Sequence, residues 1–145
     1  LVVGITGYGN TSRGAQEILA LLGPQTLTPQ ALAAGAPTAG QAPVVQVIFR
    51  EEDLVEPLQS TDPFVLSDYY AHPERYRSAF SRYLPHLHLL LNCIYWEPRY
   101  PRVVTLQDLR RLFAHPGRPP RLRVIADISC DIGGSCEATV RATSQ

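Results

Sequence analysis

The sequence contains no lysine and no methionine. All thirteen basic residues are arginine, which excludes a Schiff base or a lysine general base among these side chains. A lysine needed for catalysis would have to lie outside these 145 residues. The length suits one domain with a real core, and the missing methionine suggests an internal start. We therefore expect residues 1–145 to form a single domain excised from a larger chain.

Net charge and long apolar runs are also lacking. Thirteen acidic residues balance the arginines, so the composition indicates neither nucleic acid nor an anionic membrane as a partner. No apolar run approaches the length of a membrane span, and the start lacks the basic region of a signal peptide. We expect a cytoplasmic protein, or a mitochondrial matrix protein if the source is an animal.

Cysteines are few, and their spacing is not that of metal ligands. Cys93, Cys130 and Cys136 are an odd number in a chain without a secretory signal, which favours free thiols in a reducing compartment. We expect them to be small buried side chains near strand ends, and we predict no metal site. His86 and His88 would fall on one face of a strand, but two imidazoles without carboxylate or thiolate support do not indicate a metal.

The first residues combine a strand, a glycine turn and a helix. Residues 1–6 predict a short buried strand, residues 7–14 a turn, and Ala15 the start of a helical pattern. This context turns a glycine motif into a dinucleotide-binding hypothesis. Gly7 permits the tight turn, and Gly9 has no Cβ to keep a pyrophosphate from the backbone.

Three more residues of the turn are expected to hold the pyrophosphate. Asn10 and Arg13 flank Ser12, which stands where a third glycine is usual. A serine is still small enough for close helix–strand packing, and its hydroxyl can cap the helix or bind a phosphate oxygen. The helix N-terminus adds unpaired N–H donors.

Strand patterns alternate with helical patterns along the chain, as in a parallel sheet. We expect strands over 1–6, 25–28, 44–49, 87–92 and 122–127, and helices over 29–34, 69–84 and 105–113. We also expect a loop over 35–43, and a short helix with an irregular crossover over 50–63. Thr105 and Asp108 are expected to cap the last helix. We predict an α/β fold of Rossmann type, a doubly wound parallel sheet in three layers, with a ligand crevice at the carboxyl ends of the strands.

The residue that reads the adenosine ribose is expected about twenty residues after the glycines. Thr28 falls at that distance. It has no carboxylate to repel a 2′-phosphate, so we expect NADP as the cofactor, with NAD as the alternative. Arg13 and Arg50 are candidates to reach that phosphate.

The glycine turn resembles the nucleotide turn of lysine–oxoglutarate reductase, the saccharopine-forming half of bifunctional aminoadipic semialdehyde synthase. The resemblance rests on four segments in the same order: GYGNTSRGAQ at 7–16, HPERY at 72–76, NCIYW at 92–96 leading into Pro101-Arg102, and DISCDIGGS at 127–135. More distantly, the chain is similar to the nucleotide-binding domain of alanine dehydrogenase and proton-translocating transhydrogenase.

The resemblance implies an oxidoreductase that positions NAD(P)H for hydride transfer to the imine of lysine and 2-oxoglutarate, or runs the reverse reaction. Asn92, Ile94 and Tyr95 would then line the nicotinamide side, and Asp131 would face the substrate as a catalytic residue. The residues alone favour a different interpretation, in which Asp131 before two glycines is a turn aspartate that bonds its own backbone. The resemblance also implies a partner domain that carries a proton-transferring lysine and histidine, so this domain alone would be inactive.

Two other functions stay open. A non-catalytic nucleotide-sensing module would keep the glycine turn and dispense with Asp131. A methyltransferase on the same sheet would bind S-adenosylmethionine, but it usually needs an acid near Thr28 to hold the ribose.

Overall fold

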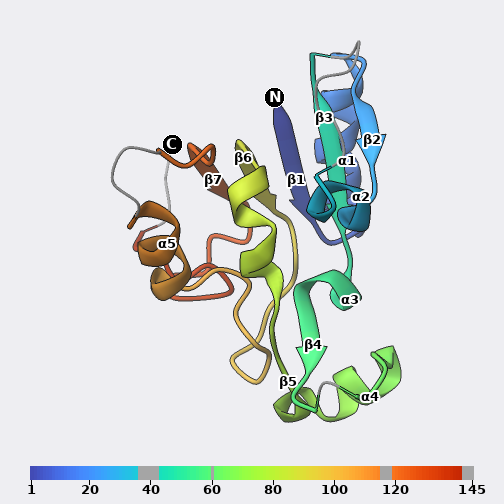
Figure 1. The fold of residues 1–145 in the computed structure, drawn as a ribbon, viewed down its shortest axis with the longest axis vertical. Coiled ribbons are helices and arrows are strands. Elements are labelled where there is room, and N and C mark those ends of the chain that lie inside the picture. Colours follow the sequence, from blue (N-terminus) through green and yellow to red (C-terminus); the bar gives the residue numbers. More distant parts are fainter. Residues whose placement is uncertain (36–42, 60, 115–118, 142–145) are drawn as a thin grey trace.

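The computed structural model describes residues 1–35, 43–59, 61–114 and 119–141. Its centre is a five-stranded parallel sheet in the order β2-β3-β1-β6-β7 (Figure 1). The strands are β1 (Val2–Thr6), β2 (Gln25–Leu27), β3 (Val45–Phe49), β6 (Leu89–Asn92) and β7 (Val124–Asp127). All five expected strands are therefore confirmed, and the ends of each lie within two residues of the expected ends.

The sheet is covered on both faces, which gives the three layers predicted from the sequence. On one face, Val3 and Ile5 of β1 pack with Leu19 of helix α1 (Asn10–Ala20). On the other face, Val2 shares a larger core with Leu32 of α2 (Pro29–Ala33), and α5 (Leu106–Phe113) packs against that core. Alternate β1 side chains thus face opposite layers, as the two-residue period of a strand requires. The sheet is doubly wound.

Helix α5 begins as its sequence predicts. The Thr105 Oγ1 accepts from the Asp108 N–H at 3.1 Å, and the Asp108 carboxylate accepts from the Thr105 N–H at 3.0 Å. This reciprocal capping box satisfies two donors that the first turn would otherwise leave unpaired.

Helix α1 begins earlier than expected. Gly9 is its N-cap, with extended backbone, and the Arg13 N–H donates to the Gly9 carbonyl at 3.0 Å. Residues 10–14, expected in the turn, are therefore helical. The expectation was wrong because the polar first turn has no apolar periodicity to mark it.

The helix expected over 69–84 is wrong. Helix α4 covers only Leu66–Ala71 and stops before His72, because the residue before a proline is disfavoured in α conformation. Pro73 opens a short 3-10 turn, η1 (Pro73–Arg75), and β5 (Tyr76–Ser78) then pairs antiparallel with β4 (Val55–Pro57). Two further 3-10 turns, η2 (Phe80–Arg82) and η3 (Leu84–His86), lead to β6.

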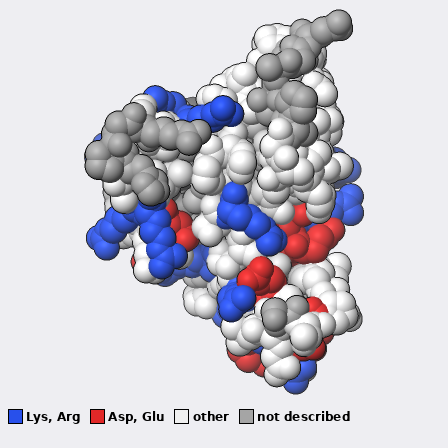
Figure 2. Space-filling model, viewed as in Figure 1, with Lys and Arg blue, Asp and Glu red and all other residues white. Residues whose placement is uncertain are grey.

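This excursion lies beyond the carboxyl ends of the parallel strands. The chain leaves β3 through α3 (Glu51–Leu54), and β4, β5 and α4 extend away from that edge of the sheet (Figure 1). Residues 36–42 of the expected loop lie outside the described part of the chain. None of the helices in the described ranges could span a membrane. Charges of both signs are interspersed on the face shown in Figure 2.

Candidate functional site

The sheet reverses its winding at β1. The chain builds β2 and β3 on one side of β1, and then crosses to build β6 and β7 on the other side. The loops after β1 and after β6 consequently diverge, and open α/β sheets bind ligands in the crevice between such loops.

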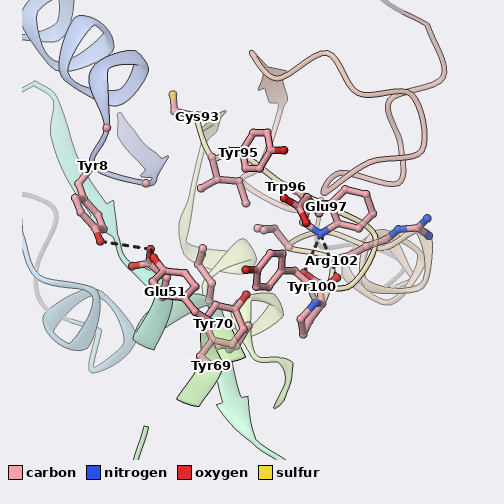
Figure 3. Close-up of a pocket in the computed structure, with 17 residues that line it drawn as sticks. Tyr8, Glu51, Tyr69, Tyr70, Cys93, Tyr95, Trp96, Glu97, Tyr100 and Arg102 are labelled. Atoms are coloured by element: carbon pink, nitrogen blue, oxygen red, sulfur yellow. Dashed lines mark hydrogen bonds between the residues drawn. The ribbon is translucent and has the colours of Figure 1, made fainter. Parts of the chain in front are cut away.

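A cavity of about 350 Å³ lies at this point (Figure 3). Its walls come from the glycine turn after β1, from α3 and α4, and from the segment after β6. The lining residues are Gly7, Tyr8, Gly9, Glu51, Leu54, Val55, Tyr69, Tyr70, Cys93, Ile94, Tyr95, Trp96, Glu97, Tyr100, Pro101, Arg102 and Val103. The structure thus brings four of the expected site residues, Gly7, Gly9, Ile94 and Tyr95, to one cavity.

Gly7 is required by the backbone. Its φ is +82°, a region that L side chains rarely adopt, and its N–H donates to the Phe49 carbonyl of β3 at 2.9 Å. A Cβ added here would also lie 3.1 Å from Cγ2 of Ile94. The tight turn brings the loop after β1 against the loop after β6.

Gly9 is not required by the chain itself. Its φ is −75°, and an added Cβ would meet no atom within 4 Å. Because Gly9 lines the cavity, the room in front of it is available to a ligand.

Of the other residues expected to hold the pyrophosphate, two are exposed and one is buried in the core. Asn10 and Arg13 are exposed on the first turn of α1, where the Arg13 guanidinium donates to Oδ1 of Asn10. Ser12 is fully buried, and its hydroxyl accepts from the Gln16 side chain at 3.0 Å. Ser12 therefore takes the packing role of the third glycine. It neither caps the helix nor faces the cavity.

Asn92 lies in the sheet and not on the cavity wall. Its exposed fraction is 1%, its Oδ1 accepts from the Thr6 hydroxyl at 2.7 Å, and its Nδ2 donates to Asp127 at 2.8 Å and to Ser135 at 2.7 Å. The expectation that Asn92 lines a nicotinamide is corrected: its amide is occupied in joining strand ends.

Asp127 completes this network. Its carboxylate accepts from the Ser129 hydroxyl at 2.8 Å and from the Thr139 hydroxyl. The segment after β7 is therefore fixed to the carboxyl edge of the sheet by side-chain hydrogen bonds, so Asp127 has a structural role.

Asp131 occupies an exposed turn in that segment. The Gly134 N–H donates to the Asp131 carbonyl at 2.8 Å, and the Asp131 side chain lies outside the cavity lining. The pKa of the Tyr95 phenol is raised chiefly by Glu97, and Asp131 contributes to the same increase. The turn uses the backbone of Asp131, and the carboxylate is close enough to Tyr95 of the cavity lining to act on its phenol.

Thr28 lies away from this site. It follows the edge strand β2, and its hydroxyl caps α2 by accepting from the Ala31 N–H at 3.1 Å. The position next to β1 belongs instead to β3, which ends at Phe49. The placement of Thr28 beside an adenosine ribose is corrected, because β3 lies between β2 and β1.

Several cavity residues were not singled out as site residues from the sequence. Oε1 of Glu51 accepts from the Tyr70 hydroxyl at 2.7 Å and from the Tyr8 hydroxyl at 3.4 Å (Figure 3). Burial and the Glu51 carboxylate raise the pKa of the Tyr70 phenol. In the sequence, the only feature that could have indicated Glu51 as a site residue is its position, with Arg50, directly after an expected strand. That position indicates the site only when β3 is known to lie next to β1.

The cysteines and histidines form no metal centre within the described ranges. Cys136 is buried and Cys93 half-buried, and burial raises the pKa of both thiols. Cys130 is exposed, contrary to expectation, because it lies in a turn with φ of +55°. Nδ1 of His88 accepts from the Val2 N–H at 3.1 Å, so this imidazole is a hydrogen-bond acceptor for the first residue of β1.

A parallel sheet that reverses at β1, with a glycine turn and a cavity at the reversal, defines an α/β protein of the Rossmann-like class. Sequence comparison identifies the family. The chain is 39% identical over 99% of its length to alpha-aminoadipic semialdehyde synthase of Arabidopsis thaliana, and 36% identical over 96% of its length to the mitochondrial alpha-aminoadipic semialdehyde synthase of Bos taurus.

The mitochondrial protein of the same name from Mus musculus is 34% identical over 96% of the chain. The chain belongs to this family, as its four motif segments predicted. It spans only 14–16% of the length of these relatives. No protein-family model matches the chain.

Proposed function

We propose that this chain binds a pyridine nucleotide across the carboxyl ends of its strands and positions it for oxidoreduction at a carbon–nitrogen bond. The observation that carries the proposal is the cavity at the winding reversal, bounded by Gly7 and Gly9 on one side and by Ile94 and Tyr95 on the other. Dinucleotides bind at this place in doubly wound sheets.

The residues present suit a pyrophosphate. The first intrahelical bond of α1 is donated by Arg13, so the N–H groups of residues 10–12 precede it and are free to donate to an anion. The open space before Gly9 leaves room for the anion to reach them. Asn10 and Arg13 supply exposed polar side chains beside the same turn.

The choice of substrate is supported by the relatives, which are named alpha-aminoadipic semialdehyde synthase, and by the resemblance to lysine–oxoglutarate reductase. We propose the imine of lysine and 2-oxoglutarate as the acceptor, giving saccharopine, or the reverse reaction. When bound, the nucleotide supplies a hydride equivalent for the imine carbon, and the imine nitrogen takes up a proton. Ile94 and Tyr95 bound the reaction side, and Asp131, close to Tyr95, faces the substrate.

The test is a calorimetric titration of the full-length protein with NADPH, NADH and S-adenosylmethionine in parallel. Binding of a reduced nicotinamide nucleotide, weakened at least tenfold by Gly9→Val, is the expected result. Gly9→Val fills the space in front of the turn without meeting the chain at its Cβ. Binding of S-adenosylmethionine alone, or of none of the three to folded protein, would contradict the proposal.

A further inference from the structure

We infer that Arg50 binds the 2′-phosphate of NADP(H) and makes this site prefer NADP(H) over NAD(H). The inference rests on the proposed function, because it assigns the cofactor-selecting residue of the same nucleotide site. It replaces Thr28, which the tertiary structure places on the wrong strand for that task.

The strand order locates the selecting position. In the dinucleotide-binding order 3-2-1-4-5-6, the strand next to the glycine-turn strand ends beside the adenosine ribose. That neighbour is β3 in this chain. Thr6 of β1 is in register with Phe49 of β3, and the Gly7 N–H donates to the Phe49 carbonyl at 2.9 Å. Arg50, the next residue, therefore lies level with Gly7.

The Arg50 side chain is directed toward the glycine turn. It is exposed, and its guanidinium carbon lies 5.1 Å from the centroid of the Tyr8 ring. A cation–π contact leaves the planar guanidinium N–H groups able to bind phosphate oxygens in a bidentate manner. The cation is thus held beside the turn without using the donors that a phosphate needs.

No ion pair joins Arg50 to a carboxylate within the described ranges. Three acids follow it in sequence, and two of them are engaged elsewhere. Glu51 accepts from the Tyr70 and Tyr8 hydroxyls, and Asp53 is buried, accepting from the Arg50 backbone N–H at 3.0 Å. Only Glu52 is exposed to solvent, where its repulsion of a phosphate is screened.

Arginine at this position discriminates by charge and by hydrogen bonding. An NAD-selective site uses a carboxylate here, which accepts from the ribose 2′-hydroxyl and repels a 2′-phosphate. Arginine has five donors and no acceptor, so it adds charge-assisted hydrogen bonds to the phosphate. The gain applies to NADP(H) alone.

The experiment measures dissociation constants of NADPH and NADH by nucleotide fluorescence on the full-length protein. Arg50→Gln is expected to weaken NADPH about 10- to 100-fold, the range of a lost charged hydrogen bond, and to leave NADH within about twofold. Arg110→Gln, an exposed arginine on α5, is the matched control. Thermal melting of each variant shows that it is folded.

The outcomes separate the two proposals. Loss of an NADPH preference in Arg50→Gln alone supports the inference. Equal binding of both nucleotides by the wild type, a preference for NADH, or a preference unchanged by Arg50→Gln would overturn it while leaving nucleotide binding intact. A preference abolished by Arg13→Gln and not by Arg50→Gln would also overturn it. Binding of neither nucleotide would overturn the proposed function, and the inference with it.

Discussion

Asn92 and Asp127 end neighbouring parallel strands and join them through a side-chain hydrogen bond, from Nδ2 of Asn92 to Oδ1 of Asp127 at 2.8 Å. The two residues are partners in the register of β6 and β7. Through Asp127, this pair also fixes the segment that carries Asp131, because Ser129 and Thr139 donate to the same carboxylate.

We expect Asp127→Ala to lower the free energy of unfolding by about 2–3 kcal/mol, because it leaves partly buried donors without their acceptor. Urea denaturation of the chain measures the change. Asp62→Ala, at an exposed aspartate, is the control and should stay within about 0.5 kcal/mol of the wild type. Equal stability of the two variants would show that the network contributes nothing.

The glycine turn offers a matched pair of substitutions. Gly7→Ala should cost about 1–2 kcal/mol of stability, because alanine is strained at φ of +82° and approaches Ile94. Gly9→Ala should cost less than about 1 kcal/mol, as an N-cap glycine with an ordinary φ. Thermal melting distinguishes the two.

For nucleotide binding by folded protein, we expect Gly9→Ala to have a larger effect than Gly7→Ala. Gly9→Ala is expected to weaken the nucleotide at least about tenfold, because its methyl group occupies space in front of the turn that the chain leaves open. A Gly9→Ala variant that binds as well as the wild type would place the pyrophosphate elsewhere.

His88 should make the stability of the chain depend on pH. Burial, assisted by nearby positive charges, lowers the pKa of this imidazole in the folded state. The unfolded chain takes up the proton first, near pH 6.5, so stability is full above that pH and decreases as the pH falls toward the folded-state pKa.

His88→Gln should reduce the loss of stability between pH 7.5 and 5.5 by up to about 1 kcal/mol. Urea midpoints at the two pH values measure it, with His86→Gln as the control. The same loss in His88→Gln as in the wild type would exclude this histidine as the source.

Thr28→Asp should leave the ratio of NADPH to NADH affinity within about twofold of the wild type. Aspartate keeps the N-cap of α2, so the fold is retained, while it adds the carboxylate that the sequence spacing would place at the ribose. Paired fluorescence titrations provide the ratio. A marked shift of this ratio toward NADH would indicate that the adenosine ribose binds at the end of β2.

Asp131→Asn separates a dehydrogenase from a nucleotide-sensing module. We expect a fall in kcat of about 100-fold or more in the full-length protein, with the nucleotide dissociation constant unchanged, because the side chain lies outside the cavity lining. Steady-state kinetics and a titration on one preparation suffice. Unchanged kcat would assign Asp131 to the turn alone.

The sequence by itself determined the elements that depend on local physics. The apolar runs specify strands wherever both faces are buried, and all five residues of β1 are buried, as its largely apolar sequence requires. Thr105 and Asp108 specify a helix start through a contact only three residues long. The glycine turn was recognisable because a positive φ at Gly7 restricts the residue type.

Only the tertiary structure decided which strand lies next to β1. Parallel strands share one pattern, so spacing along the chain cannot order them. The short, exposed β2 is an edge strand and β3 takes the central place. The residue that we propose as nucleotide-selecting is therefore Arg50, directly after β3, and not Thr28, directly after β2. Burial likewise removed Ser12 and Asn92 from the cavity wall, because their hydrogen-bond partners come from the packed elements around them.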